Sequence, residues 1–243
     1  MSIPISMYRR PTRMPFSLGF DRYARYALYF DGVDDYVRVE DAPSLRSPNS
    51  LTIIMWIRPL ENSKECLIQK GLSLTNYDYF LDLKDGVLRY AFIATDDSYH
   101  EHKYNLPVSV DQWHFVAFCR DGNDTVAYVD GAMDSWTAPL AAKDSGGRIE
   151  IGQRAGGHGY DIWFPGTIGL VCIYNRALTP EEIRYNMLNY HNPIRDGLVL
   201  WLPMEEGTGT TVHDKSGYGN HGTIYGATWK KVKMWELRAE AGL

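Results

Sequence analysis

The stretch Ala-Leu-Tyr-Phe-Asp-Gly-Val-Asp-Asp-Tyr-Val-Arg-Val, at residues 27–39, predicts two short β-strands joined by a tight turn. The strands are expected at residues 28–30 and 36–39, and the turn at residues 31–35. Gly32 can adopt a positive φ, and the flanking aspartates can accept hydrogen bonds from turn amides. The pattern therefore indicates a chain that begins as an all-β protein.

Further strands follow along the chain, each ending near glycine, proline or aspartate. β-Branched and aromatic residues dominate these runs, which is typical of strands. The expected strands are residues 51–57, 66–69, 77–83, 87–94, 99–105, 113–120, 126–129 and 149–152. Asp121-Gly122 and Asp130-Gly131 fit tight hairpin turns. Evenly spaced strands without interleaved helices favour a β-sandwich or jelly roll over a parallel α/β sheet.

One short helix is expected near residues 180–189. Thr179 fits the N-cap, Pro180 fits the first helical position, and Glu182 lies three residues after the cap. Together they form a capping-box pattern, which predicts where the helix begins. A single helix is an addition to a β architecture and does not change the fold class.

Charge is unevenly distributed along the 243 residues. Residues 1–27 hold five arginines and one aspartate, a charge of +4, so the net charge of −5 leaves −9 for the rest. This balance argues against a general nucleic-acid surface and predicts a basic N-terminal arm, either loosely packed or lying on a neighbouring subunit or acidic surface. The arm has no continuous apolar segment, so neither a secretion signal nor a membrane span is predicted. Cys66, Cys119 and Cys172 are expected to be buried thiols without disulfides.

An ordered series of motifs resembles the concanavalin A-like, laminin G-like jelly-roll family. The matching segments are residues 30–37, 51–59, 112–118, 128–131, 149–152, 164–168 and 173–183. The resemblance implies an all-β, laminin G-like jelly-roll β-sandwich whose main body spans residues 28–186. An ordered set of this kind is far more specific than any one of its motifs.

The C-terminal segment resembles the part of such a domain that normally comes first. Residues 197–209 hold the apolar run Leu-Val-Leu-Trp-Leu, and residues 213–223 hold a Gly-rich loop. We expect residues 197–229 to complete a jelly roll over residues 28–229, because an apolar strand must be buried. Completion within the chain, as a circular permutation, or in a neighbouring molecule would both achieve this, and a truncated second domain is the remaining alternative. Residues 230–243 are expected to be a tail.

Some enzymes of this superfamily cleave glycosidic bonds, and paired carboxylates would be the sequence feature of such an enzyme. A retaining glycosidase needs two carboxyl groups about 5–5.5 Å apart, which on one strand places acidic residues two positions apart. No such pair occurs; Asp78 and Asp82 are too far apart and are expected on a solvated face. His100 and His102 have a spacing that suits a metal, but no third ligand is identified. Neither a Ser-His-Asp nor a Cys-His arrangement has supporting local context, so no catalytic residue is predicted.

Calcium is the cofactor that the resemblance implies, because many similar domains hold Ca²⁺ with carboxylate and carbonyl oxygens. The implied ligands come from two Gly-rich loops that the fold is expected to bring together, and they are Asp31, Asp34, Asp35, Asp214 and Asn220. Relatives usually carry Asp-Glu shortly after the Phe164 motif, where this chain has Gly169-Leu170, and this departure argues against a metal. Turn capping is the alternative role of these aspartates.

Aromatic residues in loops are the candidates for ligand binding, because aromatic faces stack on sugar rings. The most aromatic loop spans residues 156–164, and Trp136 follows a predicted hairpin. The candidates are Trp163, Tyr160, His158, Trp136 and Tyr99. Covering the end of the sandwich is the alternative role of Trp163.

These observations predict a non-catalytic recognition or assembly module that binds a glycan or a protein surface. The basic arm and the displaced strand favour a structural or decorating subunit of a larger particle, such as a virus or phage surface, that self-associates through the arm and the C-terminal strand. The alternatives are a free carbohydrate-binding module and a glycoside hydrolase or lyase of the same superfamily.

Overall fold

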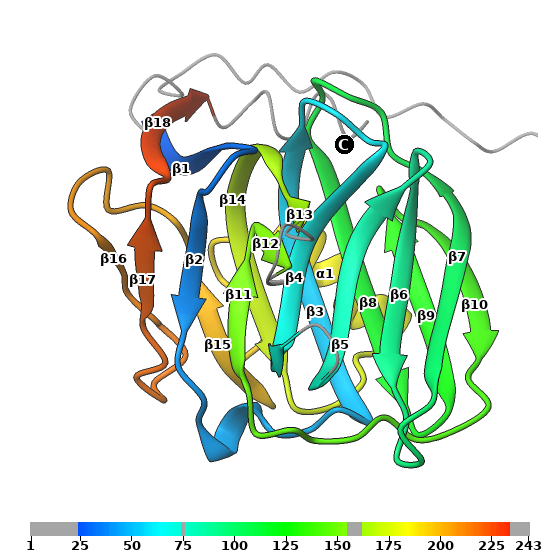
Figure 1. Cartoon of the computed structure of the whole chain (residues 1–243). Helices are drawn as coiled ribbons and strands as arrows, with labels where there is room; N and C mark the ends of the chain where they lie inside the picture. The colour runs from blue at the N-terminus through cyan, green and yellow to red at the C-terminus, as the bar shows by residue number, and fades with distance from the viewer. Residues whose placement is uncertain (1–23, 74–75, 155–161, 234–243) are drawn as a thin grey trace, which may run out of the picture.

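Two antiparallel β-sheets pack face to face in the computed structural model, which describes residues 24–73, 76–154 and 162–233 (Figure 1). The sheet nearer the viewer in Figure 1, here the front sheet, contains β2 (Tyr36–Val39), β4 (Lys64–Ser73), β5 (Asn76–Lys84), β6 (Val87–Ile93), β7 (Tyr99–Pro107), β11 (Arg148–Ile151), β16 (Thr211–Val212) and β17 (Gly222–Tyr225). The back sheet contains β1 (Ala24–Asp31), β3 (Ser50–Pro59), β8 (His114–Asp121), β9 (Asp124–Val129), β10 (Ala132–Thr137), β14 (Pro165–Tyr174), β15 (Leu198–Leu202) and β18 (Thr228–Lys233). Three short pieces complete the structure, namely the 3-10 helix η2 (Pro43–Leu45) and the paired strands β12 (Gln153–Arg154) and β13 (Ile162–Trp163). The arrangement confirms the predicted all-β jelly-roll sandwich.

Each sheet places strands from distant parts of the chain side by side. The order in the front sheet is β16-β17-β2-β11-β4-β5-β6-β7, and the order in the back sheet is β10-β9-β8-β3-β14-β1-β18, with β15 also paired to β14. At one edge, the Asn105 amide of β7 donates to Asp134 Oδ2 of β10 at 2.7 Å, which links the two sheets. At the other edge, the chain passes from β17 in the front sheet to β18 in the back sheet over Gly226 and Ala227. The chain itself therefore links the two sheets at both edges of the sandwich.

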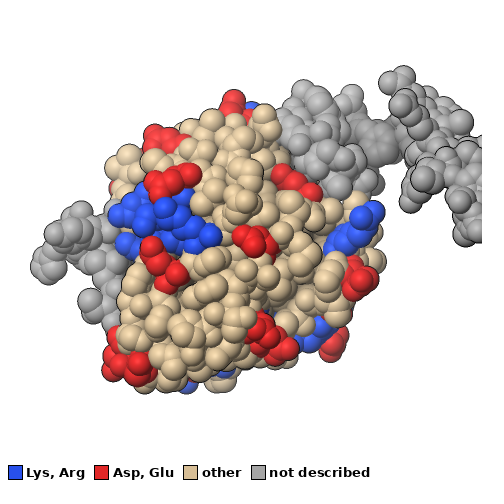
Figure 2. Space-filling model, turned by 90° about the vertical axis from the view of Figure 1, so that its right-hand side faces the viewer, with Lys and Arg blue, Asp and Glu red and all other residues tan. Residues whose placement is uncertain are grey.

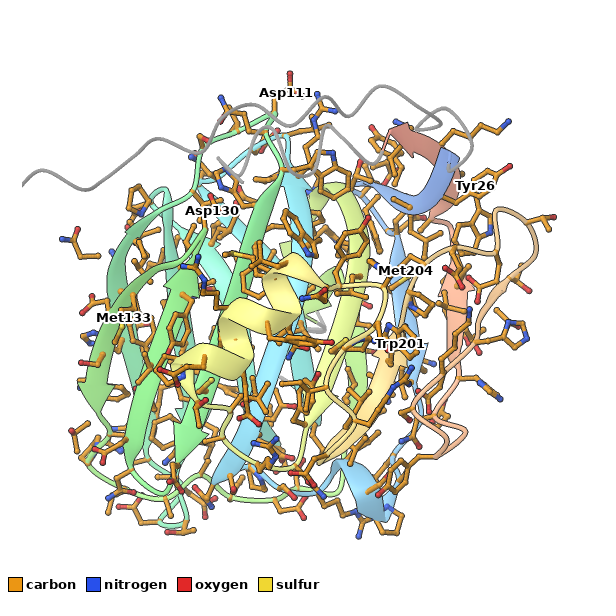
Figure 3. The ribbon with its side chains drawn as sticks, turned by 180° about the vertical axis from the view of Figure 1, so that it is seen from behind. Tyr26, Asp111, Asp130, Met133, Trp201 and Met204 are labelled. Atoms are coloured by element: carbon orange, nitrogen blue, oxygen red, sulfur yellow. The ribbon has the colours of Figure 1, made fainter. Side chains whose placement is uncertain are left out.

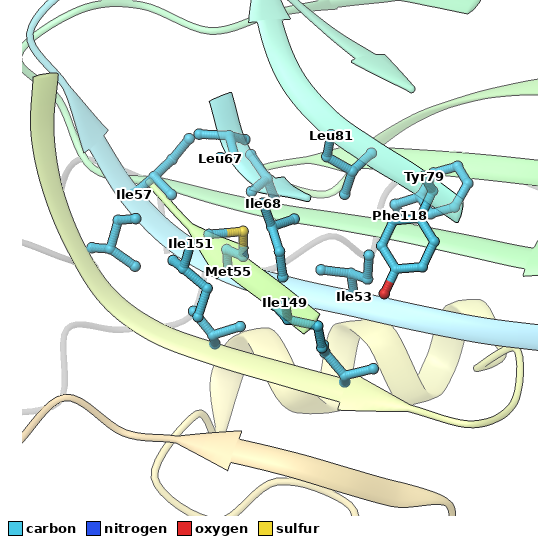
Figure 4. Packing of buried hydrophobic residues seen from close by; sticks show 14 of the residues in the cluster. Ile53, Met55, Ile57, Leu67, Ile68, Tyr79, Leu81, Phe118, Ile149 and Ile151 are labelled. Carbon is cyan, nitrogen blue, oxygen red and sulfur yellow. The ribbon is translucent and has the colours of Figure 1, made fainter. Parts of the chain in front are cut away.

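Side-chain alternation along the strands builds the core. In β2, Val37 and Val39 are fully buried while Tyr36 and Arg38 point away from the core. The buried cluster draws on both sheets (Figure 4), and its labelled members are Ile53, Met55, Ile57, Leu67, Ile68, Tyr79, Leu81, Phe118, Ile149 and Ile151. The outer faces of the two sheets do not belong to this core.

Two-residue turns join several of the strands. Asp85 and Gly86 connect β5 to β6 with φ of 56° and 77°, and Asp130 and Gly131 connect β9 to β10 with φ of 50° and 87°. Positive φ at both positions is the geometry of a type I′ hairpin, which matches the twist of the flanking strands. The predicted hairpin at residues 130–131 is confirmed, although the strand that follows it, β10, was not predicted.

The outer face of the back sheet is covered by α1 (Pro180–Leu188), as Figure 3 shows from behind. The predicted capping box is confirmed, because the Glu182 amide donates to Thr179 Oγ1 at 3.3 Å and the Thr179 amide donates to Glu182 Oε2 at 2.9 Å. Ile183 and Met187 of the helix pack on a second apolar cluster that includes Trp56 of β3. This face is thereby removed from solvent.

The C-terminal segment supplies strands to both sheets of the same chain. Leu202 of β15 is the register partner of Val171 of β14, β17 pairs with β2, and β18 pairs with β1. A jelly roll that is completed by its own C-terminal segment requires these strand pairings. Residues 230–233, expected in the tail, belong to β18, and residues 24–27, expected in the arm, belong to β1. The rest of the arm and tail, residues 1–23 and 234–243, lies outside the described residues.

The edge formed by β7 and β10 carries charges of both signs, which lie side by side in Figure 2. Lys103 Nζ lies 2.6 Å from Asp85 Oδ2, and Lys84 Nζ lies 3.6 Å from Glu101 Oε1. Charged side chains on an edge strand hinder pairing with a strand from another molecule. Figure 2 shows Lys and Arg side chains gathered in one group on this side of the molecule, with acidic side chains around it.

The three cysteines are buried and form no disulfide with one another, as predicted. Burial raises the pKa of the Cys119 thiol to about 11, so this thiol stays protonated at neutral pH. Within the three described stretches of the chain, no helix has the length and apolar character that crossing a membrane requires.

Candidate ligand-binding face

The outer face of the front sheet carries three aromatic side chains in a row, here called the aromatic platform: Tyr225, Tyr36 and Trp163. Tyr36 of β2 and Tyr225 of β17 are register partners, and their rings stack with centroids 4.5 Å apart and planes 10° apart. The Trp163 ring of β13 lies 6.3 Å from the Tyr36 ring, tilted by 41°. Tyr225 is 39% exposed, whereas Val37, the next residue after Tyr36, is fully buried. Strand alternation therefore holds the platform outward while the same strand is anchored in the core.

Arg38 joins the platform to a charged group beside it. Its guanidinium carbon lies 5.3 Å from the centroids of both tyrosine rings, and its Nη2 donates to Tyr36 Oη at 3.3 Å and to Glu150 Oε1 at 3.1 Å. Arg148 Nε donates to the same Glu150 oxygen at 2.8 Å. Burial raises the pKa of Tyr36, so its phenol stays protonated and can act as both donor and acceptor. The platform thus combines apolar ring faces with fixed polar groups.

Several buried polar atoms on this face lack a hydrogen-bond partner within the described residues. They include Gln69 Oε1, Arg38 Nε and Arg154 Nε. Gln69 is the register partner of Glu150 and of Phe80, which places it beside the charged group. An unpaired buried polar atom costs about 1–3 kcal/mol, and Gln69 is only 2% exposed, so its unpaired oxygen is a cost within the folded protein.

The centre of the front sheet holds buried ion pairs where a solvated face was expected. Asp78 and Asp82 are both fully buried, which corrects that expectation. Asp82 accepts a hydrogen bond from Arg89 Nε at 2.7 Å, and Asp78 accepts one from Lys70 Nζ at 2.6 Å. Burial raises the pKa of Asp82, and its hydrogen bonds with Arg89 oppose that rise. The burial of these carboxylates is explained by cationic partners that replace water.

The predicted ligand-binding residues do not form one group. Trp163 belongs to the aromatic platform. Trp136 lies on β10, where its ring stacks on His102 with centroids 5.0 Å apart, at the β7–β10 edge. Tyr99 on β7 is 49% exposed and its hydroxyl donates to Glu101. Tyr160 and His158 lie outside the described residues.

Two platform residues, Tyr36 and Tyr225, were not among the sequence candidates. The alternation of residues 36–39 already placed Tyr36 and Arg38 on the face opposite Val37, which is the signal that could have identified them. Tyr225 could not be found in this way, because its neighbour in the platform comes from the other end of the chain.

The β1–β2 turn gathers three of the predicted calcium ligands. One ligand oxygen from each of Asp31, Asp34 and Asp35 lies within 4.8 Å of the others. Asp35 Oδ2 accepts from the Asp31 amide and Asp31 Oδ1 accepts from the Val33 amide, each at 2.8 Å. Burial, together with the neighbouring carboxylates of Asp31 and Asp34, raises the pKa of Asp35. These hard oxygen donors suit Ca²⁺, although two of them also cap the turn.

The other two predicted ligands lie elsewhere, which corrects the expectation that the two loops meet. Asp214 accepts from the amides of Trp201 and Asn220, each at 2.9 Å. Trp201 is the register partner of Cys172, whereas Asp31 is the partner of Pro165 on the same strand. The two partners are seven residues apart on β14, which corresponds to about 23 Å along an extended strand. Asp214 and Asn220 therefore organise a separate turn.

Comparison with known proteins agrees with this architecture. A profile of the concanavalin A-like lectin/glucanases superfamily matches residues 31–184. No curated protein matches the sequence. Among solved structures, a presumed carbohydrate binding protein from Bacteroides ovatus superposes with a TM-score of 0.69 and 19% identity, over 86% of this chain and 60% of that one.

Two further solved structures share the fold. A heptameric SAP-like pentraxin from Limulus polyphemus gives a TM-score of 0.55 and 17% identity, over 67% of this chain and 82% of that chain. The binding domain of Paraclostridial Mosquitocidal Protein 1 gives 0.51 and 20% identity, over 68% and 44%. At these identities the likeness is one of fold, and this chain spans only about 60% of the Bacteroides structure.

Proposed function

This chain belongs to the concanavalin A-like lectin/glucanase superfamily, and from that premise we propose that it is a recognition module that binds glycans on its front sheet without cleaving them. The observation that carries the proposal is the aromatic platform, in which Tyr225 and Tyr36 stack beside Trp163. Sugar rings present apolar C–H faces to aromatic rings and hydroxyl groups to polar side chains, and Arg38, whose side chain is 25% exposed, provides a polar group. The presumed carbohydrate binding of the Bacteroides protein agrees with this assignment.

Binding rather than cleavage is proposed because the carboxylates of this face are already engaged. Asp82 is held by Arg89, and Glu150 is held by Arg38 and Arg148. A glycosidase needs one carboxyl group that can donate a proton to the leaving oxygen and a second one near the sugar. Carboxylates bound by guanidinium groups are poorly suited to either task.

A glycan panel tests the proposal on the isolated protein. We expect saturable binding to at least one glycan, weakened about tenfold by Tyr225→Ala, because loss of one aromatic contact costs about 1–1.5 kcal/mol. Tyr218→Ala is the matched control, since Tyr218 is 59% exposed and lies on another loop. Equal binding by the two variants, or no binding to any glycan, would overturn the proposal.

A role as a structural or decorating subunit of a virus or phage particle is a separate proposal. Two features support it in the sequence, the basic arm at residues 1–27 and the displaced C-terminal strand. The pairing of β15, β17 and β18 with strands of the same chain supports the free binding module, and the basic arm supports the assembly role. Sedimentation over a range of concentrations distinguishes the two, because a subunit should form a discrete oligomer or polymer.

Calcium binding at the β1–β2 turn is also proposed, with Asp31, Asp34 and Asp35 as ligands. The bound ion would neutralise neighbouring carboxylates and hold the turn that leads into β2. Ca²⁺ at a hundredfold excess over its Kd should then raise the free energy of unfolding by about 2.7 kcal/mol. The unfolding temperature should rise as a result. Asp34→Asn should abolish the rise, whereas Asp97→Asn on another exposed loop should retain it. An unfolding temperature that is the same in calcium and in chelator would exclude the site.

A further inference from the structure

Two arginines beside the aromatic platform share one carboxylate. Arg38 on β2 and Arg148 on β11 both donate to Glu150 Oε1, at 3.1 and 2.8 Å. β2 and β11 are neighbours in the front sheet, and Arg38 is the register partner of Glu150 (Figure 1). Tyr36 precedes Arg38 by two residues and therefore lies on the same face of the sheet. The platform thus continues into a group with two positive charges and one negative charge.

Both guanidinium groups reach the surface, whereas the carboxylate between them is buried. The side chains of Arg38 and Arg148 are 25% and 31% exposed, and that of Glu150 is 4% exposed. In the part of the chain that the structure describes, Glu150 is the only acidic side chain in an ion pair with either arginine. Glu40, which is exposed just after β2, forms no ion pair with them there. The accessible side of this group therefore consists of cationic N–H donors.

Several of these donors have no acceptor among the described residues. A guanidinium carries five N–H donors in a planar fork. Arg38 donates through Nη2, to Tyr36 Oη and to Glu150 Oε1, and Arg148 donates through Nε. Both terminal nitrogens of Arg148 are left for an acceptor from outside the protein. Two parallel N–H groups of this kind match the two oxygens of one carboxylate.

The two charges act on the platform itself. The Arg38 guanidinium carbon lies 5.3 Å from the ring centroids of Tyr36 and Tyr225. Burial raises the pKa of Tyr36, and the charges of Arg38 and Arg148 oppose that rise. Thr223, the register partner of Arg38, is exposed and adds a hydroxyl group to the same row. A ligand that contacts the Tyr225 ring therefore lies beside cationic donors.

We propose that the platform is specific for acidic glycans, in which a sugar with a carboxylate stacks on Tyr225 and pairs its carboxylate with Arg148 and Arg38. This inference rests on the proposed glycan binding and names the class of sugar. The carboxylate of a uronic or sialic acid lies at the edge of the ring. The ring face is therefore free to stack while the charge reaches the guanidinium groups.

A purely structural role of the two arginines is the competing explanation. Arg89, on the same sheet, shows what such a role requires. Its side chain is 4% exposed, and it pairs with two carboxylates, those of Asp82 and Glu101. The ratio is reversed at the platform, where one carboxylate receives two partly exposed guanidinium groups, those of Arg38 and Arg148. Neutralising a single buried carboxylate requires only one arginine.

Calorimetric titration of the full chain with matched oligosaccharides tests the proposal. Uronic acid oligomers and sialylated oligosaccharides are compared with the same compounds after methyl esterification, which keeps the rings and removes the charge. We expect at least one acid to bind about tenfold more tightly than its ester, the range of a charge-assisted hydrogen bond. Added salt should weaken binding of the acid and leave that of the ester unchanged. The acid that binds identifies the source of the carboxylate.

Variants locate the effect at the platform. Arg148→Gln should weaken binding of the acid about tenfold and leave binding of the ester unchanged, and Arg148→Lys should restore part of the loss because it keeps the charge without the planar fork. Arg184→Gln is the matched control, since Arg184 is exposed on α1 and makes the same change in net charge. It should bind the acid like the parent protein. Far-UV circular dichroism and thermal unfolding verify that each variant is folded.

The outcomes separate this inference from the proposed function. Equal affinity for each acid and its ester would overturn the acidic specificity and leave glycan binding intact. Tighter binding of a sulfated oligosaccharide than of any carboxylate sugar would overturn the assignment of the carboxylate. Equal losses in Arg148→Gln and Arg184→Gln would show a general effect of net charge and overturn the assigned site. Failure of every glycan to bind would overturn both proposals.

Discussion

The two outer faces of the sandwich follow the same strand alternation but have opposite fates. The back face presents Trp56, and α1 covers it with Ile183 and Met187. The front face presents Tyr36 and Tyr225, and neither of the two described helical elements, α1 and η2, covers these rings (Figures 1 and 3). Aromatic side chains are covered by α1 on the back face, whereas on the front face Tyr77 and Phe80 are buried and Tyr36 and Tyr225 are at least partly exposed.

The composition around the rings explains this difference. On the back face the neighbours of Trp56 are the rings of Phe115 and Tyr190, at 5.6 and 6.2 Å, and an apolar surface of this kind must be covered. On the front face the neighbours of the platform are Arg38 and Glu150, which form an ion pair at 3.1 Å and make this surface polar. The helix α1, which begins with the capping box, covers the outer face of the back sheet and shields that face from solvent.

The largest expected effect comes from a matched pair of tryptophan variants, one on each face. Trp56→Ala should lower the free energy of unfolding by about 4 kcal/mol, because Trp56 is 1% exposed and its removal leaves a cavity. Trp163→Ala should cost about 1 kcal/mol or less, because Trp163 is only partly buried. Urea denaturation of both variants measures the difference.

Glycan binding should show the reverse order in the same two variants. Trp163→Ala should weaken binding, and folded Trp56→Ala should retain it. Similar losses of stability in the two variants would break the comparison, because the front face would then be part of the core as well.

The next effect comes from the buried ion pair at the centre of the front sheet. Arg89→Met leaves Asp82 buried without its main cationic partner, which should cost about 3 kcal/mol at neutral pH. Removing Arg89 raises the pKa of Asp82 further above the usual 3.8, so the folded state holds this proton more tightly than the unfolded state. The free energy of unfolding of the variant should therefore fall as the pH rises from about 4 towards neutral.

The double variant Arg89→Met/Asp82→Asn is the control for this pair. It removes the charge at position 82, so the additional pH dependence should disappear and part of the stability should return. Denaturant titrations at several pH values measure both. A pH dependence that survives in the double variant must come from another group.

The smallest effect concerns the cap of the helix that closes the back face. Hydrogen bonding to Arg176 holds the pKa of Glu182 below its usual 4.5, so its contribution to stability is present above that value and is lost as the pH falls through the lowered pKa. Glu182→Gln should cost about 1 kcal/mol at pH 7 and remove this acid dependence. Glu181→Gln, in the same turn but outside the capping box, should behave like the parent protein, and unfolding curves at acidic and neutral pH measure the difference.

The elements with a local signal were predicted well from the sequence. Asp130-Gly131 marks its hairpin through two positive φ values, and Thr179 with Glu182 marks the start of the helix. β10 was missed, because the segment Ala-Met-Asp-Ser-Trp-Thr is exposed or partly exposed throughout and shows no apolar alternation. A strand that buries neither face relies on its neighbour for pairing, and pairing is not visible in a single segment.

The candidate sites were harder to predict, because they depend on strand register. The sequence predicted a solvated Asp82, because only the register shows that Arg89 lies opposite it. Likewise, only the pairing of β14 with β1 and β15 shows that Asp31 and Asp214 lie far apart. Tyr36 had a local signal, but Tyr225 had none. Chemistry that joins distant segments thus requires the sheet order, whereas the fold class required only the order of the motifs.

The pairing of β1 with β18 has a mechanical consequence. Their register runs from Ala24 opposite Lys233 to Tyr29 opposite Thr228, so the first and last described residues lie at the same end of one ladder. Tension applied between these two ends would load the backbone hydrogen bonds one after another, which unzips a ladder at low force. β18 follows β17 after only two residues, so peeling it away would also release Tyr225 from the platform. A tether at both ends would make ligand binding sensitive to force, whereas a tether at one end would leave it unaffected.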